Sequence, residues 1–212
     1  MNRYILRTTF ISLILSFTGC TPIKSTISHQ YTFTPQTQGQ IQSRSRHHTH
    51  VNAALLISKP DAMAGYRTEQ MLYVNQRFNL APFAKNAWTN PPADMLYPVL
   101  IERFQSSHAF RAISSSPYAD RADYRLDTQL LALHQNFLFK QSRLQFLAKI
   151  TLTRIKDNHV LSSRLIEENI LCPSNTPYGG VLAANIAVST FTNQTLNFVV
   201  KAIQADKGGH KI

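Results

Sequence analysis

Hydrophobic and polar residues alternate most regularly in two segments in the middle of the chain. In the first, one side is formed by every second residue from 124 to 132: Tyr124, Leu126, Thr128, Leu130 and Ala132. In the second, the same spacing brings together Leu144, Phe146, Ala148, Ile150 and Leu152. A period of two is typical of a β-strand with one buried face. A polar turn at 156–159 and a third apolar segment at 160–171 follow, which predicts an antiparallel sheet with one wet face.

Shorter segments before this sheet predict three more strands. Residues 53–58 form a continuous apolar run that is typical of a short buried strand. Residues 69–75 and 77–84 are close enough to pair as a hairpin. In the second of these, Phe78, Leu80 and Pro82 alternate with Asn79 and Ala81. Pro82 keeps the strand near an edge because it cannot donate a ladder hydrogen bond.

Two segments have the three-to-four spacing of a helix. The first is expected to begin at Asn90 as a cap, with Pro91 or Pro92 in the first turn, and to end near Ser107. Its apolar face contains Leu96, and Asp94 suits the positive end of the helix dipole. The second helix is expected after Gly179 and Gly180, with an apolar face formed by Ala184, Val188, Phe191, Thr195, Phe198 and Ala202.

Together these elements predict a single α+β domain over residues 51–205. Its sheet is mainly antiparallel, and both helices pack on one face of it. Residues 206–212 are expected to be a frayed basic tail. The chain has 212 residues and is 43% hydrophobic, which suits one domain with a substantial core.

The first twenty residues have the pattern of a bacterial lipoprotein signal. Arg3 and Arg7 precede a short apolar run, which is too short to span a bilayer. Small residues then lead to Cys20, the position at which such signals are cut and acylated. This predicts that residues 1–19 are a signal peptide and that Cys20 carries lipid, including palmitate. Thr21, the next residue, is the predicted sorting position. An ordinary signal peptide and a mitochondrial presequence are the alternatives; the run is apolar on all sides, which disfavours the second.

Residues 20–50 are expected to be a lipidated, flexible tether. The segment lacks acidic residues and is rich in Thr, Ser, Gln and His, so it has little apolar surface to bury. Within it, 31–34 is expected to add an edge strand to the domain. His47, His48 and His50 could suggest a metal site, but neighbouring histidines in a flexible segment imply no fixed geometry, and a solvated linker is the favoured interpretation.

The charge balance and the cysteines narrow the range of partners. The net charge is +11, which suits anionic lipid headgroups, glycans or an acidic protein. Nucleic acid is a poor partner for an exported chain. If Cys20 is acylated, Cys172 has no disulfide partner and is expected to be a small buried residue.

The sequence contains no recognisable catalytic motif. Nucleophile-elbow, phosphate-loop, dinucleotide-binding and zinc-protease motifs are all absent. Asp120 and Asp123 are close together, but with arginines between them a charged surface turn is favoured over a catalytic pair. His108 and His134 are each expected to be surface or satisfied histidines. We therefore predict that the protein is not an enzyme and holds no cofactor or metal.

Tyr73, Trp88, Pro92 and Leu96, followed later by Tyr124, form a pattern that resembles the ABC-type transport auxiliary lipoprotein family. The similar region extends from about residue 31 to 203, with Phe33 where the family usually has Leu. These five residues are structural or partner-contact candidates, and Trp88 is expected to pack at the junction of sheet and helix.

The resemblance implies an outer-membrane lipoprotein that faces the periplasm and works with an inner-membrane ABC transporter and an MCE-domain protein. It implies lipid transport between membranes, docking of the MCE protein, and a ring-shaped homo-oligomer. Two other functions remain open at this point: a tethered lipoprotein that binds or regulates a cell-wall synthesis enzyme, and a periplasmic hydrolase.

Overall fold

The computed structural model describes residues 27, 29–34, 50–115 and 122–208. The predicted signal peptide, Cys20, Thr21 and most of the predicted tether lie outside the described residues, as do His47, His48 and Asp120.

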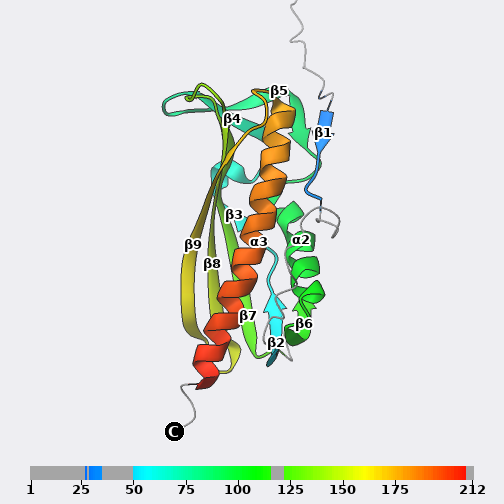
Figure 1. The fold of residues 1–212 in the computed structure, drawn as a ribbon, viewed down its shortest axis with the longest axis vertical. Coiled ribbons are helices and arrows are strands. Elements are labelled where there is room, and N and C mark those ends of the chain that lie inside the picture. The colour runs from blue at the N-terminus through cyan, green and yellow to red at the C-terminus, as the bar shows by residue number, and fades with distance from the viewer. Residues whose placement is uncertain (1–26, 28, 35–49, 116–121, 209–212) are drawn as a thin grey trace, which may run out of the picture.

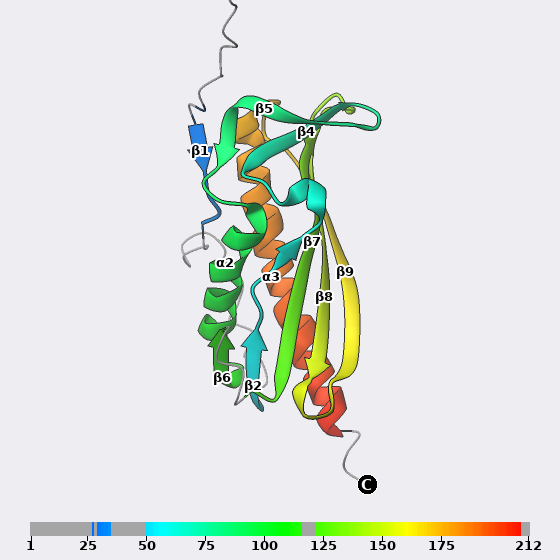
Figure 2. The same ribbon diagram turned by 180° about the vertical axis from the view of Figure 1, so that it is seen from behind.

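The fold is built around three long antiparallel strands. Strand β7 (Tyr124–Asn136) pairs with β8 (Arg143–Arg154), which pairs with β9 (His159–Leu171). The side chains of β8 alternate between buried and partly exposed, and Leu144, Phe146, Ala148, Ile150 and Leu152 are all buried. The three strands run almost the full height of the molecule in Figures 1 and 2. This antiparallel core confirms the prediction from periodicity.

Three short strands run along the other edge of β7. They are β2 (Val51–Ile57), β3 (Asp61–Ala62) and β4 (Gln70–Gln76), and each is parallel to β7. Strand β6 (Phe110–Ser115) extends the sheet beyond β2. At the opposite end, β4 forms the predicted hairpin with β5 (Asn79–Trp88), and β1 (His29–Tyr31) pairs with the end of β5.

Two helices cover one face of this sheet. Helix α2 (Pro92–Ser106) and helix α3 (Pro177–Gly208) contact each other and the sheet, and their apolar faces complete the core. Phe104, Phe146 and Phe191 are among its fully buried side chains. Short 3-10 turns, η1 (Ala64–Tyr66) and η2 (Ile155–Asp157), complete the chain. The arrangement is the predicted α+β fold with both helices on one face (Figure 1).

Some local predictions were wrong. Helix α2 is preceded by Pro91, without a side-chain cap, because the chain enters the helix through two prolines and Asn90 lies one residue too early. The alternation of β7 changes phase at a bulge between Leu130 and Ala132, so Leu133 is buried and Ala132 only partly buried.

Helix α3 is longer at both ends than the sequence predicted. It begins at Pro177, which places Gly179 and Gly180 inside its first turn, and it continues to Gly208. Asp206, predicted to begin a frayed tail, is a helix residue and accepts a hydrogen bond from Tyr124. Among the described residues, no helix is both long and apolar enough to cross a membrane.

Candidate functional site

Three of the predicted contact residues lie in the core at the junction of β5 and α2. Trp88 is 3% exposed, and Pro92 and Leu96 are also buried. The Trp88 ring lies 5.2 Å from the ring of Phe33, measured between centroids. These side chains join the segment after β1 to the hairpin and the helix, and their burial leaves them little surface for a partner.

Tyr73 belongs to an aromatic cluster between the two hairpins. Its ring centroid lies 4.6 Å from that of Phe83 and 6.0 Å from that of Phe137. The backbone N–H of Phe137 donates to the carbonyl of Val74 at 2.7 Å. The cluster therefore holds the β4–β5 hairpin against the end of β7.

Tyr124 lies at the opposite end of the molecule, in a polar network that fixes the end of α3. Its hydroxyl donates to Asp206 at 2.8 Å, and Arg154 pairs with both Asp206 and Asp157. Burial, together with the adjacent Asp206 carboxylate, raises the pKa of Tyr124 well above its ordinary value. This network is structural, because every charged group in it has a partner.

Among the described residues, the most exposed aromatic side chain lies at the end of the β4–β5 hairpin. Phe78, predicted as part of the strand over residues 77–84, is fully exposed. The reason is that Arg77 and Phe78 form the two-residue loop between the paired residues Gln76 and Asn79. The β7–β8 turn lies beside it and exposes Leu138 and Phe139. We call residues 77–80 and 137–140 together the hairpin tip; it protrudes at the upper end in Figures 1 and 2.

The outer edge of β9 is a second exposed feature. Among the described strands β9 pairs only with β8, so the backbone groups on its other edge have no strand partner there. It also exposes apolar side chains: Val160, Leu165 and Leu171. A long exposed edge with apolar residues is a surface on which another strand can add.

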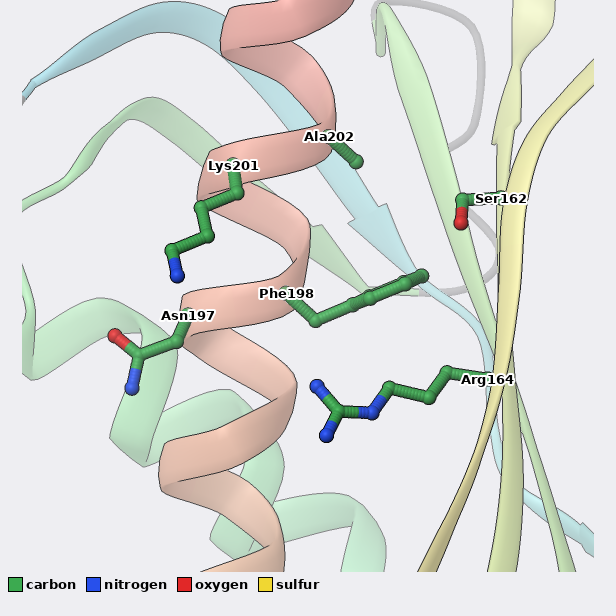
Figure 3. Close-up of a pocket in the computed structure, with 6 residues that line it drawn as sticks. All are labelled: Ser162, Arg164, Asn197, Phe198, Lys201 and Ala202. Atoms are coloured by element: carbon green, nitrogen blue, oxygen red, sulfur yellow. The ribbon is translucent and has the colours of Figure 1, made fainter.

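A hollow of about 300 Å³ lies between α3 and β9. Figure 3 shows Arg164 pointing from β9 toward the helix, beside the ring of Phe198. Lys201 and Asn197 point away from the strand. The polar groups therefore do not converge on a point where a reacting group could be held.

The titratable residues singled out by the sequence serve the fold. The ring nitrogens of His134 lie 3.0 Å from the Tyr66 hydroxyl and 2.8 Å from Gln145 Oε1, and burial lowers the pKa of this histidine. Asp123 accepts from the Ala54 N–H and from Arg111. Cys172 is a buried free thiol whose pKa is raised by burial. Among the described residues, no three His, Cys, Asp or Glu side chains form a group that could hold a metal ion.

Known structures share this fold. A Xanthomonas campestris protein of the DUF330 family superimposes with a TM-score of 0.71 at 17% identity, covering 86% of this chain and 98% of that one. A hypothetical protein from Chlamydia trachomatis gives a TM-score of 0.53 at 10% identity, covering 73% of this chain and 99% of that one. At these identities the likeness concerns the fold alone. No curated protein sequence matches this chain.

The family is shown by the sequence itself. Residues 31–195 match the model of the ABC-type transport auxiliary lipoprotein component. That match begins at Tyr31, the last residue of β1, and includes both hairpins and more than half of α3, which is most of the folded domain. The chain belongs to the ABC-type transport auxiliary lipoprotein family.

Proposed function

We propose that this protein is a non-catalytic outer-membrane lipoprotein of an ABC-type lipid transport system, and that it docks a periplasm-spanning MCE-domain protein. The family match over residues 31–195 carries this proposal, because it assigns an auxiliary role in transport. In this proposal Cys20 holds the acyl chains, Thr21 directs the protein to the outer membrane, and the folded domain faces the periplasm.

The form of the surface supports a docking role. The polar groups near the hollow between α3 and β9 do not converge, whereas the thirteen-residue strand β9 has one edge with no strand partner among the described residues. Unpaired strand edges associate through backbone hydrogen bonds, and alternate side chains then set the partner. We assign this edge to a second copy of the chain, which would build the proposed homo-oligomeric ring around the docked MCE protein.

Crosslinking in cells tests the partner. The lipidated protein carries a photoreactive residue in place of Leu165 on the β9 edge, and a control variant carries it in place of Glu102 on α2. We expect the Leu165 variant to give a crosslinked dimer that the control does not give, and both variants to recover an MCE-domain protein and the ABC transporter subunits on affinity purification. Recovery of a cell-wall synthase without any MCE protein would reject the proposal.

A further inference from the structure

Phe78 combines two features that are rarely found together. Its side chain is fully exposed, and its backbone has φ of 65°, in the left-handed region that L-residues other than Asn and Asp seldom adopt. A glycine would satisfy this turn without strain. A large aromatic residue at a strained, fully solvated position gives nothing to the fold, which indicates a contact outside the chain.

The other exposed aromatic side chains lie at the same end of the molecule. Among the described residues, those exposed aromatics are Phe78, Phe139 and Tyr178. Phe139 and Leu138 belong to the hairpin tip, and Tyr178 lies in the first turn of α3. Figures 1 and 2 place the two hairpins and the start of α3 at the upper end, with the hairpin tip projecting to the side away from β1. The exposed aromatic side chains of the described residues therefore gather at this end.

The charged residues of the hairpin tip are all positive. The sequence contains no Asp or Glu in residues 70–93, 128–156 or 169–205, which include both hairpins and the start of α3. Arg77, Lys140 and Arg143 lie at or beside the tip, and among the described residues none of them forms an ion pair. Aromatic and aliphatic residues surrounded by cations are typical of surfaces that insert into anionic lipid headgroups.

The predicted anchor at Cys20 precedes β1, and β1 lies at this same end. Strand β1 lies at the upper end in Figure 1, and Tyr31 lies beside Tyr178 with ring centroids 6.1 Å apart. Cys20 precedes His29 by nine residues, which can span at most about 30 Å. An acylated Cys20 would therefore keep the upper end of the domain close to the bilayer.

From these observations we propose that the hairpin tip inserts Phe78, Leu138 and Phe139 into the headgroup region of an anionic phospholipid leaflet. This inference rests on the proposed lipid anchor at Cys20 and adds a second, non-covalent contact with the membrane. Such a contact would fix the orientation of the domain, which a single lipid anchor cannot do. A second copy is a poor occupant, because two tips of the same positive charge repel each other.

A fluorophore at the tip tests the insertion. Asn79 is exposed and adjacent to Phe78, and the thiol of Cys172 is fully buried. In the processed, acylated protein, Asn79→Cys can therefore be labelled selectively with an environment-sensitive dye. Lys156→Cys, in the η2 turn at the opposite end, is the matched control. Both proteins are reconstituted in phosphatidylethanolamine–phosphatidylglycerol vesicles, with and without lipids that carry a nitroxide quencher.

We expect the dye at position 79 to shift to the blue and to be quenched by the nitroxide lipids, and the dye at 156 to do neither. Adding Phe78→Ser should abolish most of this quenching while leaving the thermal stability unreduced. Equal responses at 79 and 156, or quenching unaffected by Phe78→Ser, would overturn the inference. A shift that grows with protein density and ignores the quencher would assign the tip to a second copy and also overturn it.

The experiment separates this inference from the proposed function. Mass spectrometry of the purified protein first establishes whether Cys20 carries acyl chains. If it does not, the anchor fails, and Asn79→Cys is labelled in a Cys20→Ala background and added to preformed vesicles to test the tip by itself. The dye at position 79 could show neither a blue shift nor quenching on a protein that is acylated and binds the MCE protein. That result would reject the membrane insertion and leave the proposed function intact.

Discussion

At the scale of single residues, the backbone of Phe78 predicts that this position is not optimised for stability. A left-handed conformation costs an L-residue about 1–2 kcal/mol, and the exposed ring makes no contact that would offset this cost. Phe78→Gly should raise the free energy of unfolding by up to about 1 kcal/mol, because the entropy cost of glycine cancels part of the gain. Urea denaturation measures the change.

Asn158→Gly is the control for this prediction. Asn158 has φ of 52°, but asparagine tolerates the left-handed region, so its replacement should gain less. A loss of stability in Phe78→Gly would mean that the ring packs against the domain, and would remove the argument that Phe78 serves an external contact.

Gly180 is a residue at which any side chain would collide with the core. A Cβ there would lie 2.5 Å from Oε1 of Gln135. Gln135 is held in place because its Nε2 donates to Ser142 at 2.8 Å and to the Thr176 carbonyl at 3.2 Å. Gly180→Ala should therefore lower the free energy of unfolding by about 1–3 kcal/mol. Gly65→Ala, where the Cβ would meet no atom within 4 Å, should change it by less than about 0.5 kcal/mol. Equal effects would contradict this account.

These two residues show what periodicity misses at this scale. The alternation over residues 77–84 predicts a strand there, but it includes Arg77 and Phe78, which form the two-residue loop, because alternation alone cannot locate a turn. Gly179 and Gly180 were interpreted as the entry to a helix. Their actual constraint is the approach of Ser174 and Gln135, which the distant parts of the chain bring there.

At the scale of elements, β1 is a short strand at the edge of the sheet. It pairs with β5 through three residues, and the stack of Phe33 on Trp88 supports it. Trp88→Ala should cost about 3–5 kcal/mol of stability, as is usual when a buried Trp is truncated. It should also raise hydrogen exchange in residues 29–34 above the general increase. Trp88→Phe keeps part of the contact and should cost less. Unchanged stability in Trp88→Ala would show that the ring is not part of the core.

The end of α3 gives a prediction for acid pH. Hydrogen bonds from Arg154 lower the pKa of Asp157 from 3.8 to about 2 in the folded chain. Because the folded-state pKa is depressed, the stabilisation is complete above pH 3.8 and is lost as the pH falls toward 2. Asp157→Asn should therefore flatten the decrease of melting temperature between these two pH values.

Tyr124→Phe is the comparison for the acid prediction. It removes the hydrogen bond to Asp206 and should cost about 1 kcal/mol. The phenol is uncharged throughout the acid range, so the slope of melting temperature against pH should stay close to that of the wild type. If Asp157→Asn leaves the decrease of melting temperature at acid pH unchanged, another carboxylate causes that decrease.

The elements with strong periodicity were the ones that the sequence predicted well. Strands β7, β8 and β9 and both helices have long repeating patterns, and each lies within a few residues of its predicted position. The parallel pairing of β2, β3 and β4 along one edge of β7 was not anticipated. These strands are short, and their partners are chosen by the packing of the whole sheet, which leaves no trace in local spacing.

At the scale of the whole molecule, the two ends have different tasks. The lower end closes the fold through the network of Tyr124, Arg154 and Asp206, and the upper end presents the hairpin tip. The sequence predicts an anchor at Cys20 but does not predict the tip, because the tip exists only where two hairpins meet. An anchor near His29 and an apolar tip at the same end would give the domain a defined orientation toward a membrane.

The anchor itself gives the last prediction. If Cys20 is the acylated residue, Cys20→Ala should abolish incorporation of radiolabelled palmitate and leave the chain unprocessed.

Thr21→Asp should keep palmitate incorporation but retain the protein in the inner membrane, because an acidic residue after the lipidated cysteine resembles a retention signal. Separation of the two membranes on a density gradient measures this difference, with Thr21→Ser as the conservative control. Thr21→Asp protein that still reaches the outer membrane would remove Thr21 as the sorting residue, and labelled Cys20→Ala protein would remove Cys20 as the anchor. The two variants together therefore separate attachment to a membrane from the choice of membrane.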